Sequence, residues 1–124
     1  MTDRQFVIDF ALSLAGTSAD CPFEEDFFTT VLRHKASKKW FGILLYAPLS
    51  RVGLKGEGKT EVLNLKCDPF TAELMRENFS AVQPAYHMNK NHWISVVLDG
   101  DLPNEELEKL IVLSYELTGG KNQS

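Results

Sequence analysis

Apolar residues recur at the spacing of an amphipathic helix in three stretches of the chain, the first of them near the N-terminus. Thr2 and Gln5 stand at the two positions of a capping box, in which each side chain bonds the backbone of the other residue. We therefore expect a helix from about Asp3 to about Leu14, which Gly16 ends. Its apolar side would consist of Phe6, Val7, Phe10, Ala11 and Leu14.

The second predicted helix follows a break in the pattern near the middle of the chain. Asp68 is a good N-cap residue and Pro69 suits the first helical position, which predicts a helix over residues 69–78. Its apolar stripe contains Phe70, Leu74, Met75 and Phe79.

The third predicted helix begins near Pro103 or Asn104. Gly119 and Gly120 follow it, at the place where a left-handed C-terminal cap is expected. Residues 120–124 are then expected to form a frayed tail. The apolar stripe of this helix consists of Leu107, Leu110, Ile111, Ser114 and Leu117.

Between the first two helices, and again after the second, polar and apolar residues alternate with a period of two, which is the pattern of strands. The predicted strands are residues 27–34, 40–46, 51–54, 61–66 and 93–98. Glycine, serine and lysine fill the connections, so consecutive strands are expected to pair as an antiparallel meander. Helices before, within and after this run predict an α+β fold: a two-layer sandwich with a mainly antiparallel sheet and the helices on one face.

The composition is that of one ordinary globular domain. The chain has 124 residues, of which 44% are hydrophobic and 24% are charged, so residues 1–124 are expected to form a single domain. No apolar run approaches the roughly eighteen residues of a membrane span, and the acidic start is unlike a signal peptide. We expect a cytoplasmic monomer with no membrane contact. Cys21 and Cys67 lack the spacing of a metal or disulfide motif and are expected to be reduced and largely buried.

The net charge of −4 argues against a nucleic-acid-binding protein, because affinity for DNA comes largely from basic side chains on phosphates. The distribution of charge changes this picture. Residues 31–60 carry seven bases and one acid, whereas residues 1–30 carry one base and six acids. A local basic surface can exist on an acidic domain. Alternatively, these lysines belong to a solvated sheet edge and discourage aggregation between strands.

The segment from Val82 to Leu98 is the densest polar and aromatic run of the chain, so any catalytic or binding chemistry is expected there. His87 and His92 are ligand-type residues, as is Cys67, but their spacing is not that of a metal site. No catalytic motif and no glycine-rich phosphate loop accompanies them. We therefore expect no metal, no cofactor, no catalytic residue and no enzymatic activity.

The polar residues of this segment also have an architectural interpretation. Tyr86, His87 and Asn89 would bond backbone groups and hold an irregular connection, with the histidine buried and neutral.

The alternation of strands 61–66 and 93–98 predicts which side chains meet the helices. The helix-facing residues would be Leu63, Leu65, Ile94 and Val96. The opposite face would then present Asn64, Lys66, Trp93 and Ser95, with Trp40 as a neighbour. Such a mixture of aromatic and polar groups is typical of a binding surface. The alternative is a tryptophan folded beneath the second helix, since large apolar residues are normally buried.

Four blocks of the sequence, all within residues 63–117, resemble the signature blocks of the MmcQ/YjbR family, and the resemblance as a whole covers nearly the whole chain. The longest is Tyr-His-Met-Asn-Lys-x-His-Trp at residues 86–93, and the others are residues 63–69, 98–100 and 114–117. The resemblance implies a fold similar to CyaY, the frataxin-like fold, and a proposed double-wing mode of binding to double-stranded DNA. It implies no enzymatic activity.

Two functions follow as expectations. If the resemblance holds, DNA would be bound by lysines on hairpin tips together with side chains that reach bases or sugars, namely Lys38, Lys39, Lys55, Lys59, Lys66, His87, Asn89, Lys90 and His92. The alternative is a protein-interaction or scaffold domain without nucleic-acid binding, which would use an open sheet face formed by Trp40, Asn64, Lys66 and Trp93.

Overall fold

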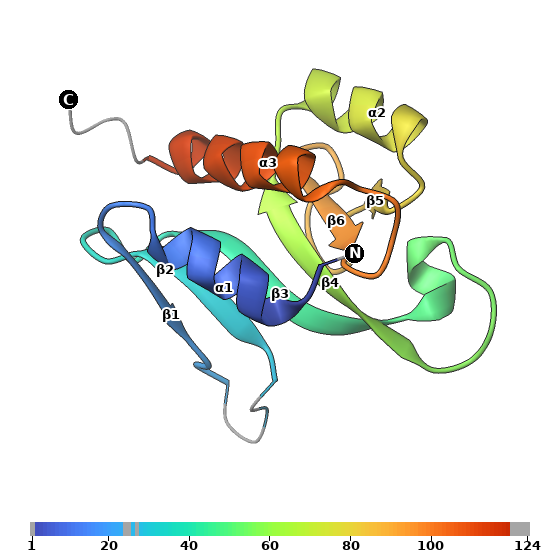
Figure 1. The fold of residues 1–124 in the computed structure, drawn as a ribbon, viewed down its shortest axis with the longest axis horizontal. Helices are drawn as coiled ribbons and strands as arrows, with labels where there is room; N and C mark the ends of the chain where they lie inside the picture. The colour runs from blue at the N-terminus through green and yellow to red at the C-terminus, as the bar shows by residue number, and fades with distance from the viewer. Residues whose placement is uncertain (1, 24–25, 27, 120–124) are drawn as a thin grey trace.

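The computed structural model describes residues 2–23, 26 and 28–119, and these form three α-helices and a six-stranded sheet (Figure 1). The α-helices are α1 Arg4–Leu12, α2 Pro69–Asn78 and α3 Asn104–Leu117, and a 3₁₀ helix, η1, covers Leu49–Val52. The strands are β1 Thr17–Asp20, β2 Thr30–His34, β3 Trp40–Pro48, β4 Lys59–Lys66, β5 Val82–Pro84 and β6 Trp93–Val97. None of the helices in this part of the chain is long and apolar enough to cross a membrane.

The sheet is antiparallel throughout and has the strand order β1-β2-β3-β4-β6-β5. The first four strands pair in sequence order as a meander, and α2 separates them from the last two. Strand β6 pairs with β4, and β5 lies outside β6 as an edge strand. The predicted α+β fold with an antiparallel sheet is therefore confirmed.

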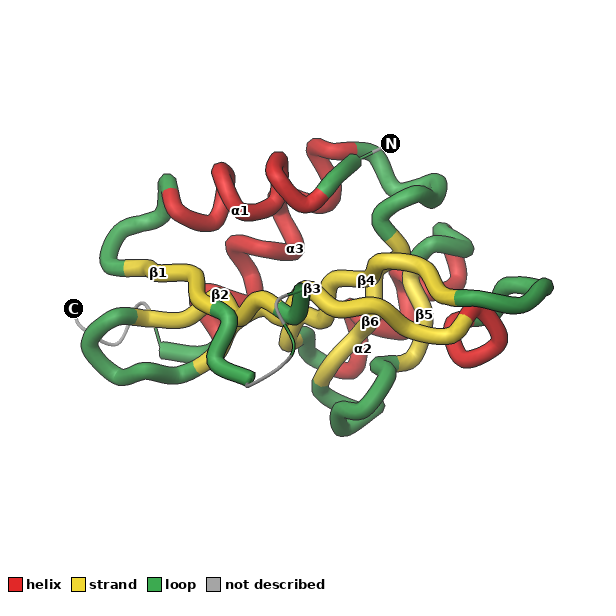
Figure 2. Tube along the Cα trace, turned by 90° about the horizontal axis from the view of Figure 1, so that it is seen from below, coloured by secondary structure: helices red, strands yellow, loops and turns green. Residues whose placement is uncertain are grey.

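Helices α1 and α3 lie over the same face of the sheet, as the edge-on view in Figure 2 shows. Arg4 of α1 donates a hydrogen bond of 2.9 Å to Thr30, and Thr118, at the end of α3, lies 2.8 Å from His34. Because side chains alternate along a strand, Thr30 and His34 of β2 project from one face. Helix α2 packs mainly against the edge strand β5. The core beneath the helices includes the cross-strand row Leu44, Leu63 and Val96.

The opposite sheet face is partly covered by two connections. Phe23, in the connection between β1 and β2, lies edge-on against Trp40, with the ring centroids 6.0 Å apart. Residues 85–92 fold back beneath β4 and β6, where Asn64 is 1% exposed and Ser95 is 0% exposed. The expectation that Asn64 and Ser95 belong to an open face is wrong, because backbone groups of the connection cover them in place of water.

The predicted capping box of α1 is also wrong. Asp3 is the N-cap, and its Oδ1 accepts a hydrogen bond of 2.9 Å from the backbone N of Phe6. The Thr2 hydroxyl instead donates to Asn104, and Gln5 donates to Asp9. An aspartate that caps directly competes with the reciprocal Thr and Gln arrangement, and sequence spacing alone does not decide between them.

The predicted bounds of α2 and the predicted start of α3 are confirmed. The predicted apolar stripes are wrong at Phe70, Leu74 and Leu117, which are exposed, and α2 buries Ala72 beside the predicted Met75. Asp68 Oδ2 accepts a hydrogen bond of 3.0 Å from the N of Thr71, and Pro69 begins α2. Helix α3 begins at Asn104, and Gly119 after it has a positive φ of 118°. Gly120 and the predicted tail, residues 120–124, lie outside the described residues.

The strand predictions need three corrections. The edge strand β5 was not predicted. Strand β1, which is short and polar, was not predicted. A strand at 51–54 was predicted, but this stretch ends η1 and then turns at Gly53, whose φ is +77°. A left-handed residue of this kind turns the chain out of an extended path. Strand β2 begins at Thr30, and Phe27 lies outside the described residues.

Candidate functional site

The connection between β5 and β6, residues 85–92, contains the signature block and is held from beneath by a closed ring of hydrogen bonds. The Ser95 hydroxyl donates to Asn64 Oδ1 at 2.5 Å, and Asn64 Nδ2 donates to the carbonyl of Tyr86 at 2.9 Å. The N–H of Tyr86 then donates to Ser95 Oγ at 2.8 Å. Satisfied buried networks of this kind fix one conformation. We call residues 85–92 the signature loop.

The far end of the signature loop is held by a side-chain cap. Asn89 Oδ1 accepts a hydrogen bond of 2.8 Å from the N of Asn91, and the Asn89 carbonyl accepts from the N of Trp93 at 3.0 Å. Lys90 Nζ donates to the carbonyl of Ala85 at 2.8 Å, which closes the loop on itself. Asn89 therefore bonds the backbone as the architectural interpretation expects. Tyr86 differs from that expectation, because its own backbone groups are held by the side chains of Asn64 and Ser95.

The histidines of the loop are exposed, so the expectation of a buried, neutral histidine is wrong for this segment. His87 has a φ of +66°, a conformation that side-chain-bearing residues rarely adopt. Its ring lies against that of Tyr86, with centroids 3.8 Å apart, and the guanidinium of Arg51 lies 5.5 Å from the centroid of Tyr86. His87, Tyr86 and Arg51 thus form a packed set at the surface.

A shallow groove of about 330 Å³ lies beside this set, and we call it the aromatic groove. It is lined by Phe23, Asp26, Thr29, Leu45, Tyr46, Tyr86 and His87. Hydrogen bonds from Thr29 and Phe28 to the Asp26 carboxylate lower its pKa below 3.8, so the groove wall carries a fixed negative charge. Sequence reasoning missed Phe23 and Tyr46, because nothing in their local patterns links them to the signature block.

The predicted DNA-binding lysines do not form one patch. Lys38 and Lys39 lie in the connection from β2 to β3, and Lys55 lies in the connection from β3 to β4, with Lys59 at the start of β4. These connections lie at opposite ends of β3 (Figure 1). Nine residues of strand span about 30 Å, so roughly this distance separates the two pairs of exposed lysines. We call them the first and the second wing.

The two arginines near the wings already have partners. Arg33 makes two hydrogen bonds to the carboxylate of Asp20, at 2.9 and 3.1 Å, and lies 5.9 Å from the centroid of Trp40. Arg51 lies over Tyr86. Free positive charge in this region is therefore provided chiefly by lysines.

The alternative interaction face is smaller than expected. Lys66 and Trp93 pair directly between β4 and β6, and both are half-buried, as is Trp40. Asn64 is buried and contributes no surface. The accessible members are thus Trp40, Lys66 and Trp93, beside the Phe23 ring that lies edge-on to Trp40.

The ligand-type residues do not converge on a metal site. Cys67 is 1% exposed, and burial raises the pKa of its thiol to about 11, whereas His87 and His92 are exposed. In the part of the chain that the structure describes, no group of three or more His, Cys, Asp or Glu side chains could hold a metal ion. Cys21 is exposed, which corrects the expectation that both thiols are buried.

Charge is distributed unevenly between the sheet and the helix layer. Residues 31–66, from β2 to the end of β4, carry eight bases and two acids. Helix α3 carries four glutamates and one lysine. An acidic chain therefore combines a basic sheet region with an acidic helix.

The chain is similar to several proteins of the same family. It matches the family model described as YjbR over residues 12–117. It is 38% identical over 118 residues to the uncharacterized protein YyaQ of Bacillus subtilis, covering 95% of this chain and 99% of that one. It is 44% identical over 54 residues to the uncharacterized protein YjbR of Escherichia coli, covering 44% of this chain and 46% of that one.

Solved structures agree with this relationship. A crystal structure from Pseudomonas syringae aligns with a TM-score of 0.87 at 37% identity, covering 94% of this chain and 99% of that chain. A crystal structure from Deinococcus radiodurans aligns with a TM-score of 0.75 at 26% identity, covering 98% and 82%. The resemblance seen in the signature blocks is confirmed, and the chain belongs to the YjbR family.

Proposed function

We propose that this protein binds double-stranded DNA without catalysing a reaction, and that its two wings contact the phosphate backbone. The observation that carries the proposal is the separation of the wings, about 30 Å along β3. One turn of B-DNA is about 34 Å long. Lysines at the two ends of β3 therefore match phosphates about one turn apart on one side of a duplex.

The signature loop supplies groups suited to the space between the wings. His87 lines the aromatic groove beside Tyr46 of β3, and Asn89 and His92 are exposed on the same loop. Imidazole and amide groups can donate to and accept from bases and sugars. Lys66 and Lys90 add positive charge, although Lys90 also holds the carbonyl of Ala85.

The proposal is tested by fluorescence anisotropy with a labelled mixed-sequence duplex of about 20 base pairs over a range of salt concentrations. If the four wing lysines each displace a counterion, a plot of the logarithm of the binding constant against the logarithm of the salt concentration should have a slope of about −3.6. The double variant Lys38→Gln, Lys39→Gln should make the slope shallower by about 1.8. The variant Lys55→Gln, Lys59→Gln should do the same. Lys109→Gln, on α3, is the control and should leave the slope unchanged.

Duplex length tests the spacing of the wings separately. A duplex of about 8 base pairs is shorter than one turn and should engage one wing only, whereas a duplex of about 16 base pairs engages both. The longer duplex should therefore bind about tenfold more tightly, because the second contact is intramolecular. This advantage should vanish in the Lys38→Gln, Lys39→Gln variant. Absence of binding at about 50 µM protein in low salt would refute the function itself.

A protein-interaction domain is the second candidate, and the exposed aromatic side chains favour it. Phe28 is 63% exposed, Tyr46 is 44% exposed and Phe23 is 42% exposed, and their rings pack edge-on in pairs with one another or with Trp40. Aromatic residues and arginine are enriched among the side chains that contribute most to protein interfaces.

The second candidate is distinguished by its resistance to salt. A partner captured from lysate by this surface should stay bound after nuclease treatment and at high salt, since the contact is apolar. Phe28→Ala with Tyr46→Ala should abolish that capture, and Phe70→Ala, an exposed phenylalanine on α2, is the matched control. Loss of capture on nuclease treatment would instead favour DNA binding.

A further inference from the structure

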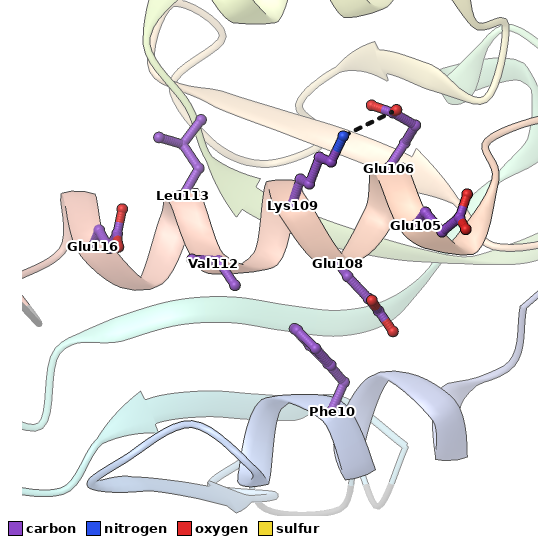
Figure 3. Close-up of a pocket in the computed structure, with 8 residues that line it drawn as sticks. All are labelled: Phe10, Glu105, Glu106, Glu108, Lys109, Val112, Leu113 and Glu116. Carbon is purple, nitrogen blue, oxygen red and sulfur yellow. Dashed lines mark ion pairs between the residues drawn. The ribbon is translucent and has the colours of Figure 1, made fainter.

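A groove of about 800 Å³ runs between α1 and α3, on the helix layer of the molecule (Figure 3). Phe10 contributes to it from α1, and α3 contributes all of its other lining residues. These are Glu105, Glu106, Glu108, Lys109, Val112, Leu113 and Glu116. None of them belongs to the wings or to the signature loop.

The groove exists because each helix packs on the sheet more closely than on the other helix. Helix α1 buries Val7 and Ala11, and α3 buries a row of its own toward the sheet, namely Leu107, Leu110, Ile111 and Ser114. The flanks of the two helices are left facing one another. Figure 3 shows Phe10 pointing from α1 toward the side of α3 that carries Glu108 and Val112.

The floor of the groove is apolar and continuous with the core. Phe10 and Val112 are half-buried and face one another between the two helices (Figure 3). Leu113 projects from the other side of α3, and it packs against the core cluster, as Phe10 does. Covering these exposed apolar surfaces with a further apolar group is energetically favourable.

The rim of the groove is acidic. Four glutamates and one lysine line it, which gives a formal charge of −3. The Nζ of Lys109 lies 3.7 Å from Oε2 of Glu106, so the lysine forms an ion pair with a glutamate of the same helix. Glu105, Glu108 and Glu116 have no such partner among the ion pairs of the described residues.

We propose that this groove is a docking site for a short basic amphipathic helix of a partner protein. The acidic rim is complementary to lysine or arginine, and the apolar floor is complementary to one apolar side of a helix. An acidic or uncharged segment would leave the rim unpaired, and a uniformly basic segment would leave the floor uncovered.

The spacing of the rim agrees with a helical partner. Glu105, Glu108, Val112 and Glu116 follow one another at intervals of three and four residues along α3, which places them in one row. This row is about 16 Å long, the length of a helix of about eleven residues. A partner helix lying along α3 would place basic side chains at both ends of the row and apolar side chains at Val112.

The experiment is an NMR titration of the ¹⁵N-labelled protein, residues 1–124, with a synthetic helix of about 14 residues that carries leucine on one side and lysine on the other. We expect amide shifts confined to α1 and α3, around Phe10 and residues 105–116. A peptide of the same composition in scrambled order, without an apolar side, should bind about tenfold more weakly because it cannot cover the floor. Equal binding of the two peptides would overturn the proposal.

Matched variants test the location. Glu105→Gln with Glu108→Gln should weaken the amphipathic peptide about fivefold, as expected for two exposed ion pairs. Glu73→Gln with Glu77→Gln makes the same charge change on α2, beside the exposed Phe70 and Leu74, and should have little effect. An effect of the α2 variant equal to that of the α3 variant would show attraction by total charge and overturn the site.

The apolar floor is tested with Val112→Ser, which changes a half-buried side chain and leaves the rim charge unaltered. The affinity for the amphipathic peptide should fall about threefold. The amide spectrum of the variant without peptide should show that its fold is retained. Sedimentation of the protein alone completes the test. If wild-type protein self-associates and the Glu105→Gln, Glu108→Gln variant does not, the groove receives a second copy of this chain and the proposal is wrong.

Discussion

His34 joins the sheet to the end of α3 and is only 7% exposed. Its Nε2 lies 2.8 Å from Thr118 Oγ1, and the Thr118 hydroxyl donates to the carbonyl of Ser114 at 2.8 Å. The histidine nitrogen is therefore the donor. Burial lowers the pKa of His34 below 6.5 because the imidazolium would lose hydration. The nearby charge of Lys39 acts in the same direction, and a hydrogen bond with the backbone of Tyr115 acts against it.

The lowered pKa of His34 predicts that the protein loses stability as pH falls below about 6.5. In this range the unfolded chain takes up a proton that the folded chain does not, so acid favours unfolding until pH reaches the folded pKa. His34→Gln keeps a hydrogen-bond donor and removes the titration. Urea unfolding at about pH 7.5 and about pH 5 should show a smaller difference for this variant than for wild type. His92→Gln, at an exposed position, should retain the wild-type difference.

Asn64 and Ser95 illustrate what residue patterns do not reveal. Both stand at outward positions of alternating strands, where a polar residue normally indicates solvent. Their partners are backbone groups of Tyr86, whose position depends on how residues 85–92 fold back. The alternation thus predicted the strand faces correctly, but it gave no information on what covers them.

This buried ring predicts a large effect for a small substitution. Asn64→Ala would leave the Ser95 hydroxyl and the Tyr86 carbonyl without their partner, which should lower the free energy of unfolding by about 2 kcal/mol. Hydrogen exchange at residues 86–92 should accelerate, since the loop loses its anchor. Urea unfolding and amide exchange measure the two effects. Asn91→Ala, in the same loop but exposed, should change stability by less than about 0.5 kcal/mol, and an equal loss in both variants would contradict the argument.

Among the elements, those with explicit end signals were predicted best. Helix α2 has both an N-cap aspartate and a proline at its first position, and its predicted bounds agree with the structure. Strand β1 and η1 lack such signals. Thr17–Asp20 forms a strand because it pairs with β2, and Leu49–Val52 forms a 3₁₀ turn because Gly53 ends it in a left-handed conformation. Pairing partners and turn conformations are tertiary information that a short segment does not contain.

The cap of α2 makes a prediction of its own. Asp68→Ala removes the acceptor for the N–H of Thr71 and should lower the free energy of unfolding by about 1 kcal/mol. The same hydrogen bond lowers the pKa of Asp68 below 3.8, so the stabilisation is present above that pH and is lost as pH falls through the folded value. Urea unfolding near neutral pH measures the loss. Asp68→Asn, which can still accept, should retain most of the stability, and an equal loss in both variants would show that the charge matters more than the acceptor.

For the whole molecule, family and fold class followed from the sequence, whereas the distribution of charge between layers did not. The basic run at residues 31–60 was evident along the chain, but the meander places its lysines at opposite ends of β3. The acidic residues near the C-terminus gather on α3, over the other side of the core. A ligand of either sign therefore meets an attractive and a repulsive part of the same small domain.

This arrangement predicts how acids on the helix layer influence the proposed DNA binding. In about 0.15 M salt the Debye length is about 8 Å, so charges on α3 should scarcely affect a duplex held at the wings. In about 0.01 M salt the Debye length is about 30 Å, so a bound duplex interacts with charges over the whole protein. Glu105→Gln with Glu108→Gln should then raise DNA affinity several-fold at the lower salt and leave it within about twofold at the higher.

The matched change on α2 decides how this effect arises. Glu73→Gln with Glu77→Gln alters the total charge equally, so a purely long-range effect requires both variants to raise low-salt affinity to a similar degree. Anisotropy with the same labelled duplex measures both. If the α3 variant alone changes affinity, and does so at about 0.15 M salt as well, the duplex must lie close to α3. The wings would then not be the surface that holds it, because they lie at the ends of β3 and not on the helix layer.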